Sequence, residues 1–305
     1  ESEQLRRIVG KKKVKEMPKW KSKIEQKVID RNLPHEVGEV LWKVAEDSAN
    51  YSFNKSHSIA YATLAAWTTY LKFNYPQEFF IALLEMAKFE PTPHEEIRKV
   101  SHELHHFSIE LLNPDLSKSK MGFKKEGKNI RFGLNSIKGI SEKSLEALES
   151  FIDSESSNKY DIFLSAKQAG LNIGILSSLI QAGTLSGYDK KRSVLVLEAQ
   201  TFNLLTDREK RNVIALGEKF NYDVLKTISS AVKDELVGDD GKRLIPERRF
   251  ETIKKKYGPY KEIYEKNKKY EDFANWFYEN KLLGYSYSSE LKDVFKSSNS
   301  DLLGS

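Results

Sequence analysis

The spacing of hydrophobic residues predicts that the first third of the chain is helical. Helices are expected at 5–9, 17–29, 37–49, 59–75, 77–88 and 95–107. Gly10, Pro34 and Pro76 stand beside these segments, where such residues commonly end or begin helices. Segment 59–75 is apolar on nearly every side, which predicts a deeply buried helix. Residues 50–58 are polar and aromatic, which predicts a loop.

The hydrophobic pattern changes after residue 107. Residues 108–135 combine short apolar runs with Asn113-Pro114-Asp115 and several glycines, which is typical of short strands joined by turns. Small helices punctuated by glycines are expected in 134–186, and polar helices rich in Lys, Glu and Tyr in 190–305. No repeat of fixed period is present. The expected fold class is therefore mainly α, with a small β insertion.

Composition adds one asymmetry. The 305 residues carry a net charge of +6, and residues 1–31 contain the whole excess, with 11 Lys and Arg against 5 acidic residues. Concentrated positive charge suits a phosphate-bearing partner, although a solvated basic helix face has the same composition. The absence of cysteine excludes disulfides, thiolate metal sites and a thiol nucleophile, and is compatible with a reducing cytoplasm.

No membrane segment or signal peptide is expected. The longest uncharged stretch, 56–71, is interrupted by His, Ser and Thr and is shorter than the roughly 20 apolar residues of a spanning helix. The chain begins with Glu1 rather than Met, so we expect a fragment of a longer protein.

Two short motifs resemble metal sites. His102, Glu103 and His106 satisfy the H-E-x-x-H pattern of zinc hydrolases, but no further histidine follows as a third ligand. The pair Asp239-Asp240 is similar to polymerase aspartates, but it sits between Gly238 and Gly241 without a hydrophobic strand. We expect a polar helix face and an exposed turn, respectively, and no metal site.

Residues 134–148 predict two short helices joined by a hairpin at Lys138-Gly139-Ile140-Ser141. This arrangement resembles the helix-hairpin-helix motif, in which backbone N–H groups point at a DNA phosphate. Gly139 permits the tight turn, and Ser141 replaces the usual second glycine and can cap the second helix. A plain helical hairpin is the alternative. Residues 176–185 could close a second such unit.

A polar cluster precedes the apolar helix at 59–75. Asn54, Lys55, Ser56, His57 and Ser58 place several hydrogen-bond donors at a helix N-terminus, where the helix dipole favours anions. The residues alone leave a phosphate site and a simple loop cap equally open.

Several motifs, in order, resemble the family C replicative DNA polymerases, the bacterial DNA polymerase III alpha subunits. The motifs are L-R-R-I-V-G-K-K-K (5–13), F-N-K-S-H-S-x-A-Y-A (53–62), Y-L-K-x-x-Y-P-x-E-F-F-x-A-L-L (70–84), L-L-N-P-D-L (111–116), I-R-F-G-L-N-S-I-K-G-I (130–140) and L-I-Q-A-G-T-L (179–185). The resemblance covers about residues 4–190 and fades over 191–270. Residues 281–285 resemble the stretch that precedes the family's OB-fold domain.

The resemblance implies a nucleotide site and a DNA site. The family's fingers bind the incoming dNTP, with basic side chains at its triphosphate, because guanidinium forks suit phosphate oxygens. The residues expected at the dNTP are Arg6, Arg7, Lys12, Lys13, Asn54, Lys55, Ser56, His57 and Tyr61. The residues expected at primer–template DNA are Lys11, Lys138, Gly139, Ile140, Ser141 and Lys143. These DNA contacts would grip the backbone without reading sequence.

The resemblance also implies what lies elsewhere. The family's palm aspartates bind the catalytic Mg²⁺ ions, and no acidic motif here replaces them, so this chain alone is expected to be inactive. The remaining polymerase chain, primer–template DNA and dNTP are the expected partners, in the cytoplasm of a bacterial or phage-infected cell. The sliding clamp and other replisome proteins are further candidates, although 215–222 does not fit the family's clamp-binding motif. A non-catalytic DNA-binding or adaptor module derived from polymerase fingers is the alternative.

The expected organisation has four parts. A fingers domain takes 1–107, a small β insertion 108–133, a helix-hairpin-helix module 134–190, and a divergent helical region before an absent OB-fold 191–305.

Overall fold

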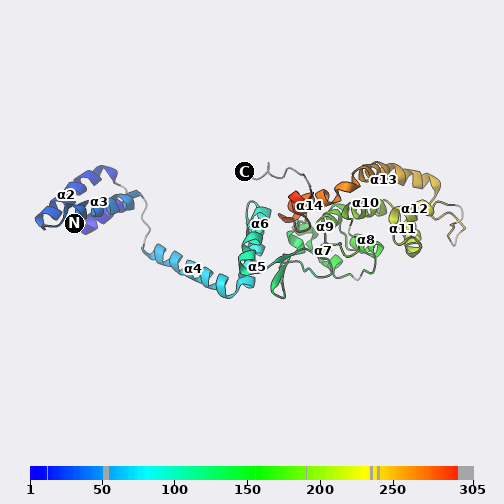
Figure 1. The fold of residues 1–305 in the computed structure, drawn as a ribbon, viewed down its shortest axis with the longest axis horizontal. Helices are drawn as coiled ribbons and strands as arrows, with labels where there is room; N and C mark the ends of the chain where they lie inside the picture. The colour runs from blue at the N-terminus through cyan, green and yellow to red at the C-terminus, as the bar shows by residue number, and fades with distance from the viewer. Residues whose placement is uncertain are drawn as a thin grey trace. The chain divides into compact units, whose positions relative to one another are not determined.

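The computed structural model describes residues 1–11, 13–50, 55–154, 156–189, 191–233, 236–238 and 241–294. The chain divides into two compact units, Glu1–Asn74 and Tyr75–Ser305, which we describe separately as unit 1 and unit 2 (Figure 1). Its described part is mainly helical with one small sheet, which confirms the predicted fold class. None of the described helices is both long and apolar enough to cross a membrane.

Unit 1 consists of helices with a small core. Its elements are α1 (Ser2–Gly10), a 3-10 turn (Val14–Glu16), α2 (Met17–Asp30), α3 (His35–Asn50) and α4 (Lys55–Asn74). Ile8, Met17 and Val28 are buried. Helix α3 faces α2 at Gly38, where a Cβ would lie in ordinary contact, at 3.4 Å, with a Val28 methyl group.

The sequence prediction of a deeply buried helix at 59–75 is wrong for this unit. No described residue of α4 is buried, and Trp67 and Phe73 are 63% and 69% exposed. An all-round apolar helix needs partner surface on every side, and unit 1 has only a small core to provide it. Part of the loop predicted at 50–58 is helical, because α3 includes Asn50 and α4 begins at Lys55; residues 51–54 lie outside the described residues.

Unit 2 begins with a helical pair and a three-stranded sheet. The helices are α5 (Pro76–Met86) and α6 (Pro93–Leu104), each followed by a 3-10 turn (Ala87–Phe89 and His105–Phe107). The strands are β1 (Leu111–Leu112), β2 (Lys124–Glu126) and β3 (Asn129–Arg131). The sheet order is β1-β3-β2, with β1 parallel and β2 antiparallel to β3. The sheet therefore lies within the predicted β insertion.

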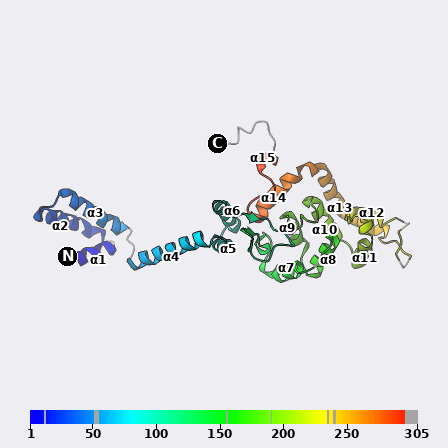
Figure 2. The same ribbon diagram turned by 60° about the horizontal axis from the view of Figure 1, so that its bottom comes forward.

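The rest of unit 2 is helical (Figure 2). The α-helices are α7 (Leu145–Ile152), α8 (Lys159–Gln168), α9 (Ile173–Gln181), α10 (Arg192–Asn203), α11 (Asp207–Ala215), α12 (Val224–Ser230), α13 (Glu247–Asn267), α14 (Glu271–Leu283) and α15 (Leu291–Val294). Further 3-10 turns lie at Leu134–Ser136, Glu142–Ser144, Glu218–Phe220 and Lys268–Tyr270. One hydrophobic core runs through the unit from Phe80 to Leu283, with Tyr160 and Phe202 among its fully buried or nearly buried side chains.

The predicted four-part organisation remains a prediction about functional parts. The division between the compact units falls between Asn74 and Tyr75, inside the predicted fingers domain rather than at its end at residue 107. Helices α5 and α6 contribute Phe80, Leu84 and Leu104 to the core of unit 2, which explains why the structural division comes earlier.

Candidate nucleic-acid interface

The predicted hairpin at 138–141 forms a tight turn on the surface of unit 2. Gly139 has φ +96°, a left-handed conformation that favours glycine. The N–H of Ile140 donates to the carbonyl of Ile137 at 3.2 Å, and the N–H of Lys138 donates to the carbonyl of Leu282 at 3.0 Å. Hydrogen bonds thus stabilise the hairpin internally and join it to the end of α14.

The element before this hairpin differs from the prediction. Instead of a helix, residues 134–136 form a single 3-10 turn, which ends at Ile137 in an extended conformation. The neighbouring Gly133 is packed against the backbone of 122–123, and a Cβ there would lie 2.5 Å from the Gly122 carbonyl carbon. Tight packing on this side and the extended residue on the other leave room for only one turn.

Ser141 caps the following helix, as predicted. Its N–H donates to Ser144 Oγ at 3.1 Å, and Ser144 Oγ donates back to the Ser141 carbonyl at 2.7 Å. The chain then enters the 3-10 turn 142–144 and continues into α7. Backbone N–H groups of a first helical turn lack acceptors within the helix, so this end is suited to an anion.

The predicted DNA contacts on this hairpin lie at the surface. Lys138, Gly139, Ser141 and Lys143 are exposed, while Ile140 is half-buried and packs against the core. Glu142, also exposed, places one opposing charge among them. The hairpin therefore offers fixed backbone donors and two lysines on one side, anchored by an apolar residue on the other.

A second hairpin joins α8 to α9. Gly170 has φ +82°, and Asn172 caps α9 by accepting from the N–H of Ile175 at 2.9 Å. The first hairpin lies against the same helix, since a Cβ at Gly139 would lie 3.6 Å from Ser178 Oγ in the second half of α9. The sequence analysis proposed that 176–185 could close a second unit, and this range overlaps the end of α9, but it did not predict the turn at 169–172.

The predicted triphosphate ligands Arg6 and Arg7 lie exposed on α1 and share one carboxylate. Arg6 donates to both oxygens of Glu3 at 2.7 and 2.6 Å, and Arg7 Nε donates to one of them at 3.1 Å. These bonds hold the pKa of Glu3 at about 2. Glu3 was not among the predicted residues, although its spacing of three and four residues from the arginines is the signal for it.

The predicted lysines follow α1. Lys11 is exposed, and its N–H donates to the carbonyl of Arg7 at 3.0 Å, closing the helix. Lys13 pairs with Glu16 at 3.1 Å. Lys12 lies outside the described residues.

The second predicted nucleotide group is the first turn of α4. Lys55, Ser56 and His57 begin this helix and are exposed, and the rings of His57 and Tyr61 meet edge to face with centroids 4.5 Å apart. Asn54 lies outside the described residues, as do 51–53, which separate this turn from α3. The structure thus brings Arg6 together with Arg7, and His57 together with Tyr61.

The structure describes one of the two motifs that resemble metal sites, the H-E-x-x-H motif at 102–106. His102 and His106 are exposed, and α6 gives way to a 3-10 turn between them. Among the residues that the structure describes, no three His, Asp or Glu side chains are grouped to hold a metal ion. Asp239 and Asp240 lie outside the described residues.

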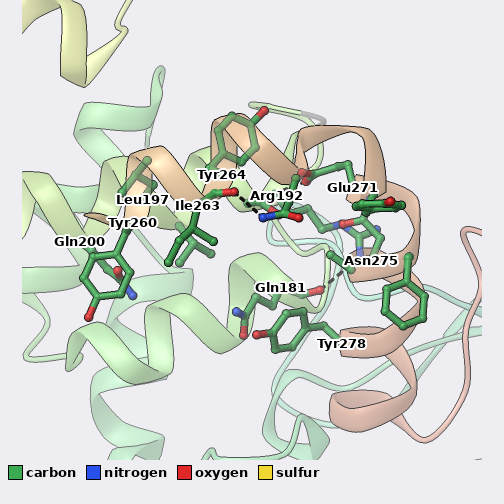
Figure 3. A pocket seen from close by; sticks show the side chains of 16 residues that line it. Gln181, Arg192, Leu197, Gln200, Tyr260, Ile263, Tyr264, Glu271, Asn275 and Tyr278 are labelled. Carbon is green, nitrogen blue, oxygen red and sulfur yellow. Dashed lines mark hydrogen bonds between the residues drawn. The ribbon is translucent and has the colours of Figure 1, made fainter. Parts of the chain in front are cut away.

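Sequence reasoning missed two adjoining cavities formed by helices far apart in the chain. One lies between α10, α13 and α14 and is lined by tyrosines (Figure 3). The other lies between α10, α12 and α13 and is lined by lysines. The only sequence signal was the density of Lys and Tyr over 254–270, which does not indicate that their side chains share a cavity.

A protein-family comparison matches the region that contains both hairpins. Residues 108–195 match the helix-hairpin-helix motif family. The match begins before the sheet and ends within α10, so the family includes both turns described above.

Curated relatives point to one kind of protein. The chain is 36% identical over 204 residues to DNA polymerase III subunit alpha of Aquifex aeolicus, covering 64% of this chain and 17% of that protein. It is 32% identical over 203 residues to DNA polymerase III subunit alpha of Thermus aquaticus, covering 65% of this chain and 16% of that protein. The match thus spans about one sixth of each relative. The chain is homologous to part of DNA polymerase III subunit alpha, which confirms the resemblance seen in its motifs.

Proposed function

We propose that the chain is the nucleotide- and DNA-contacting part of a DNA polymerase of the DNA polymerase III alpha type. The observation that carries the proposal is the pair of hairpins at 137–141 and 169–172, both of which adjoin α9, in a chain homologous to that subunit. The hairpins would hold the phosphates of primer–template DNA through backbone N–H groups, with Lys138 and Lys143 adding charge.

The arginines of α1 would bind the triphosphate of the incoming dNTP. Their planar guanidinium groups match phosphate oxygens, and fixed positive charge stabilises the charge that develops during phosphoryl transfer. Because Glu3 occupies both arginines, the triphosphate would have to replace this carboxylate. The first turn of α4, with His57 and Tyr61, would form another wall of the nucleotide site.

Nucleotidyl transfer itself would require another part of the polymerase. The Mg²⁺ ions that activate the primer hydroxyl and neutralise the triphosphate would be held by carboxylates outside this chain, so the isolated chain would not polymerise. In this proposal it acts in the cytoplasm, with the remaining polymerase chain, primer–template DNA and dNTP as partners. A contact with the sliding clamp or other replisome proteins stays a prediction.

The nucleotide role is tested in the complete polymerase. Replacing Arg6 and Arg7 with Ala should lower kcat/KM for dNTP incorporation at least 100-fold. The matched control is Lys21→Ala with Arg31→Ala, which removes the same charge from exposed positions of unit 1. Wild-type incorporation by the Arg6/Arg7 variant would contradict the assignment.

The DNA role is tested by duplex binding over a range of salt. Lys138→Gln with Lys143→Gln should weaken binding of a labelled duplex and reduce the salt slope by about 2, roughly 0.9 for each lost phosphate contact. The control pair is Lys118→Gln with Lys128→Gln, also exposed in unit 2. Loss of duplex binding here, combined with normal incorporation by the arginine variant, would favour the non-catalytic DNA-binding adaptor instead.

A further inference from the structure

The larger of the two missed cavities, about 820 Å³, is built from aromatic rings and amides. We call it the tyrosine pocket. Tyr260 and Tyr264 of α13 line it from one side, and Tyr270 and Tyr278 line it from the segment that follows. Figure 3 shows Gln181, Gln200 and Asn275 among these rings. Ring faces stack on planar ligands, and amide groups can both donate and accept hydrogen bonds at the edges of such ligands.

The two charged residues that line this pocket, Arg192 and Glu271, are engaged within the protein. Arg192 is buried and pairs with Glu279 at 2.7 Å, and it also donates to the carbonyl of Gln181 at 3.2 Å. Glu271 accepts from the N–H of Ser193 at 2.9 Å. The tyrosine pocket therefore presents a mainly aromatic and amide surface, with Glu271 as the carboxylate of its lining.

The adjoining cavity, about 590 Å³, has the opposite character. We call it the lysine pocket, and it shares Leu197 and Tyr264 with the tyrosine pocket. Five lysines line it: Lys191, Lys226, Lys233, Lys261 and Lys268. Within the described part of the chain, Lys191, Lys233 and Lys261 have no carboxylate oxygen within ion-pair distance.

The acidic residues of the lysine pocket are already engaged. Glu198 is buried and bound by Lys159 at 2.5 Å and by the N–H of Val224 at 3.0 Å. Asp223 pairs with Lys226 at 3.4 Å, and Glu265 pairs with Lys268 at 3.1 Å. Among the described residues, the pocket thus keeps three positive charges without an ion-pair partner, which favours an anionic ligand.

We propose that the two pockets together bind single-stranded DNA, with bases in the tyrosine pocket and phosphates at the lysine pocket. Stacking rings beside a row of positive charges is the arrangement that binds single strands independently of sequence. A duplex keeps its base faces stacked inside, so it cannot use the tyrosine rings. An acidic peptide would use the lysines but would leave the rings and amides without planar partners.

The position of α9 relates this site to the hairpins. The helix begins at the cap Asn172 of the second hairpin and ends at Gln181, which lines the tyrosine pocket. Its 9 residues span about 14 Å at 1.5 Å per residue. The second hairpin and the tyrosine pocket are therefore one short helix apart. A duplex at the hairpins and a single strand at the pockets would lie close together, as at a junction between double- and single-stranded DNA. The single-strand site itself does not depend on the polymerase assignment.

The experiment titrates the full chain with fluorescein-labelled dT12 and, separately, with a labelled 20-base-pair duplex, at several salt concentrations. Lys191→Gln, Lys233→Gln and Lys261→Gln together should weaken dT12 binding at least tenfold and reduce its salt slope by about 2, roughly 0.7 for each contact. Tyr260→Ala with Tyr270→Ala should weaken it at least tenfold through lost stacking. Both tyrosines are 50% or more exposed, so the fold should persist. Tyr260→Phe with Tyr270→Phe keeps the rings and should retain binding.

Matched variants distinguish DNA binding at the pockets from a general effect of positive charge and from DNA binding at the hairpins. Lys254→Gln, Lys255→Gln and Lys256→Gln remove the same charge from exposed positions of α13 that line neither pocket. Lys138→Gln with Lys143→Gln should weaken the duplex and spare dT12. The pocket variants should do the reverse, so failure of one site is distinguishable from failure of the other.

Several results would overturn the proposal. One is that the wild-type chain does not bind dT12 at about 100 μM and low salt. Another is that the pocket lysine triple and the α13 lysine triple lose the same amount of dT12 affinity. A third is that the tyrosine-to-alanine variant binds dT12 as tightly as the wild-type chain. A fourth is competition by a twelve-residue polyglutamate as strong as that by unlabelled dT12, which would identify an acidic protein segment as the ligand. Circular dichroism confirms that each variant is folded.

Discussion

At the scale of single residues, the interior of unit 2 is organised around paired charges. Glu198 links three helices, because it accepts from Lys159 of α8 and from the first N–H of α12 while lying on α10. Glu279 of α14 plays a similar part at the start of α10, where it pairs with Arg192 and accepts from the N–H groups of Tyr287 and Ser288. Each carboxylate therefore fixes elements that are distant in sequence.

Removing Glu198 should be costly. Glu198→Ala would leave the buried Lys159 ammonium with only its longer pair to Asp189 at 3.8 Å, and would leave the N–H of Val224 without its acceptor. We expect a loss of about 3–5 kcal/mol in the free energy of unfolding, measured by urea denaturation. Glu149→Ala, at an exposed position of α7, is the control and should change stability by less than about 0.5 kcal/mol. A small effect of Glu198→Ala would show that the pair is dispensable.

Lys210 is buried on α11, and its Nζ lacks a hydrogen-bond acceptor among the described residues. Burial and the neighbouring Lys167 lower its pKa to about 8. Because this folded pKa lies below the unfolded one, the charged form destabilises the native state below pH 8, and this penalty disappears as pH rises toward 10.5.

Replacing Lys210 with Met should therefore stabilise the protein in a pH-dependent way. The gain should be about 1–3 kcal/mol at pH 7 and should shrink between pH 8 and pH 10. Denaturant unfolding of both proteins at pH 7, 8.5 and 10 measures the difference, with Lys99→Met on the exposed face of α6 as the control. A difference that stays constant with pH would show that Lys210 titrates normally.

At the scale of elements, α14 is joined to the start of unit 2 through a glycine contact. Gly284 ends α14 in a left-handed conformation, with φ +91°, and a Cβ at this position would overlap the carbonyl oxygen of His94 at the start of α6. The neighbouring Leu282 carbonyl accepts from the N–H of Lys138 in the first hairpin. The end of α14 thus touches both α6 and the proposed DNA-binding turn.

Gly284→Ala should loosen this junction. The left-handed backbone and the overlap with His94 together should cost about 2–4 kcal/mol, seen as a lower Tm. Gly187→Ala is the matched control, because Gly187 is exposed, has no φ in the left-handed range and has open space around its Cβ position. Equal Tm values for the two variants would show that the α14 end can shift without cost.

The elements show which parts of the structure were predictable from the sequence. The helices α1 to α6, the β insertion and the cap at Ser141 were foreseen, because each depends on residues close together in the chain. The exposure of α4 was not foreseen. An apolar sequence favours burial, but it does not show which other surface covers the helix. The two pockets were not foreseen either, since Tyr264 and Leu197 meet only through tertiary packing.

At the scale of the whole molecule, the two units are very unequal. The large hydrophobic core is formed entirely by residues from Phe80 onward, whereas the buried hydrophobic residues before Asn74 are Ile8, Met17 and Val28 among those described. A small apolar core contributes little stability. Unit 2 therefore contains what it needs to fold, and unit 1 has much less.

The two units should behave differently when separated. A fragment of residues 75–305 should unfold cooperatively and keep the full chain's duplex and dT12 binding, whereas a fragment of residues 1–74 should have reduced helicity. Circular dichroism melts of both fragments measure this, with the intact chain as the reference. Non-cooperative unfolding of 75–305 would show that its core depends on unit 1.

The shared carboxylate on α1 has a consequence for selectivity. Glu3 is hydrogen-bonded to both Arg6 and Arg7 and acts as their counter-ion. Any anionic ligand of these arginines must therefore compete with the Glu3 carboxylate. A monoanion gains little by replacing a carboxylate that is already tethered, while a polyanion brings several oxygens against one. Exposed ion pairs of this kind are weak, so a ligand can displace Glu3 and can be released again readily. The arginines would thus bind monoanions weakly and polyanions more tightly. They would release a bound polyanion once it loses part of its negative charge.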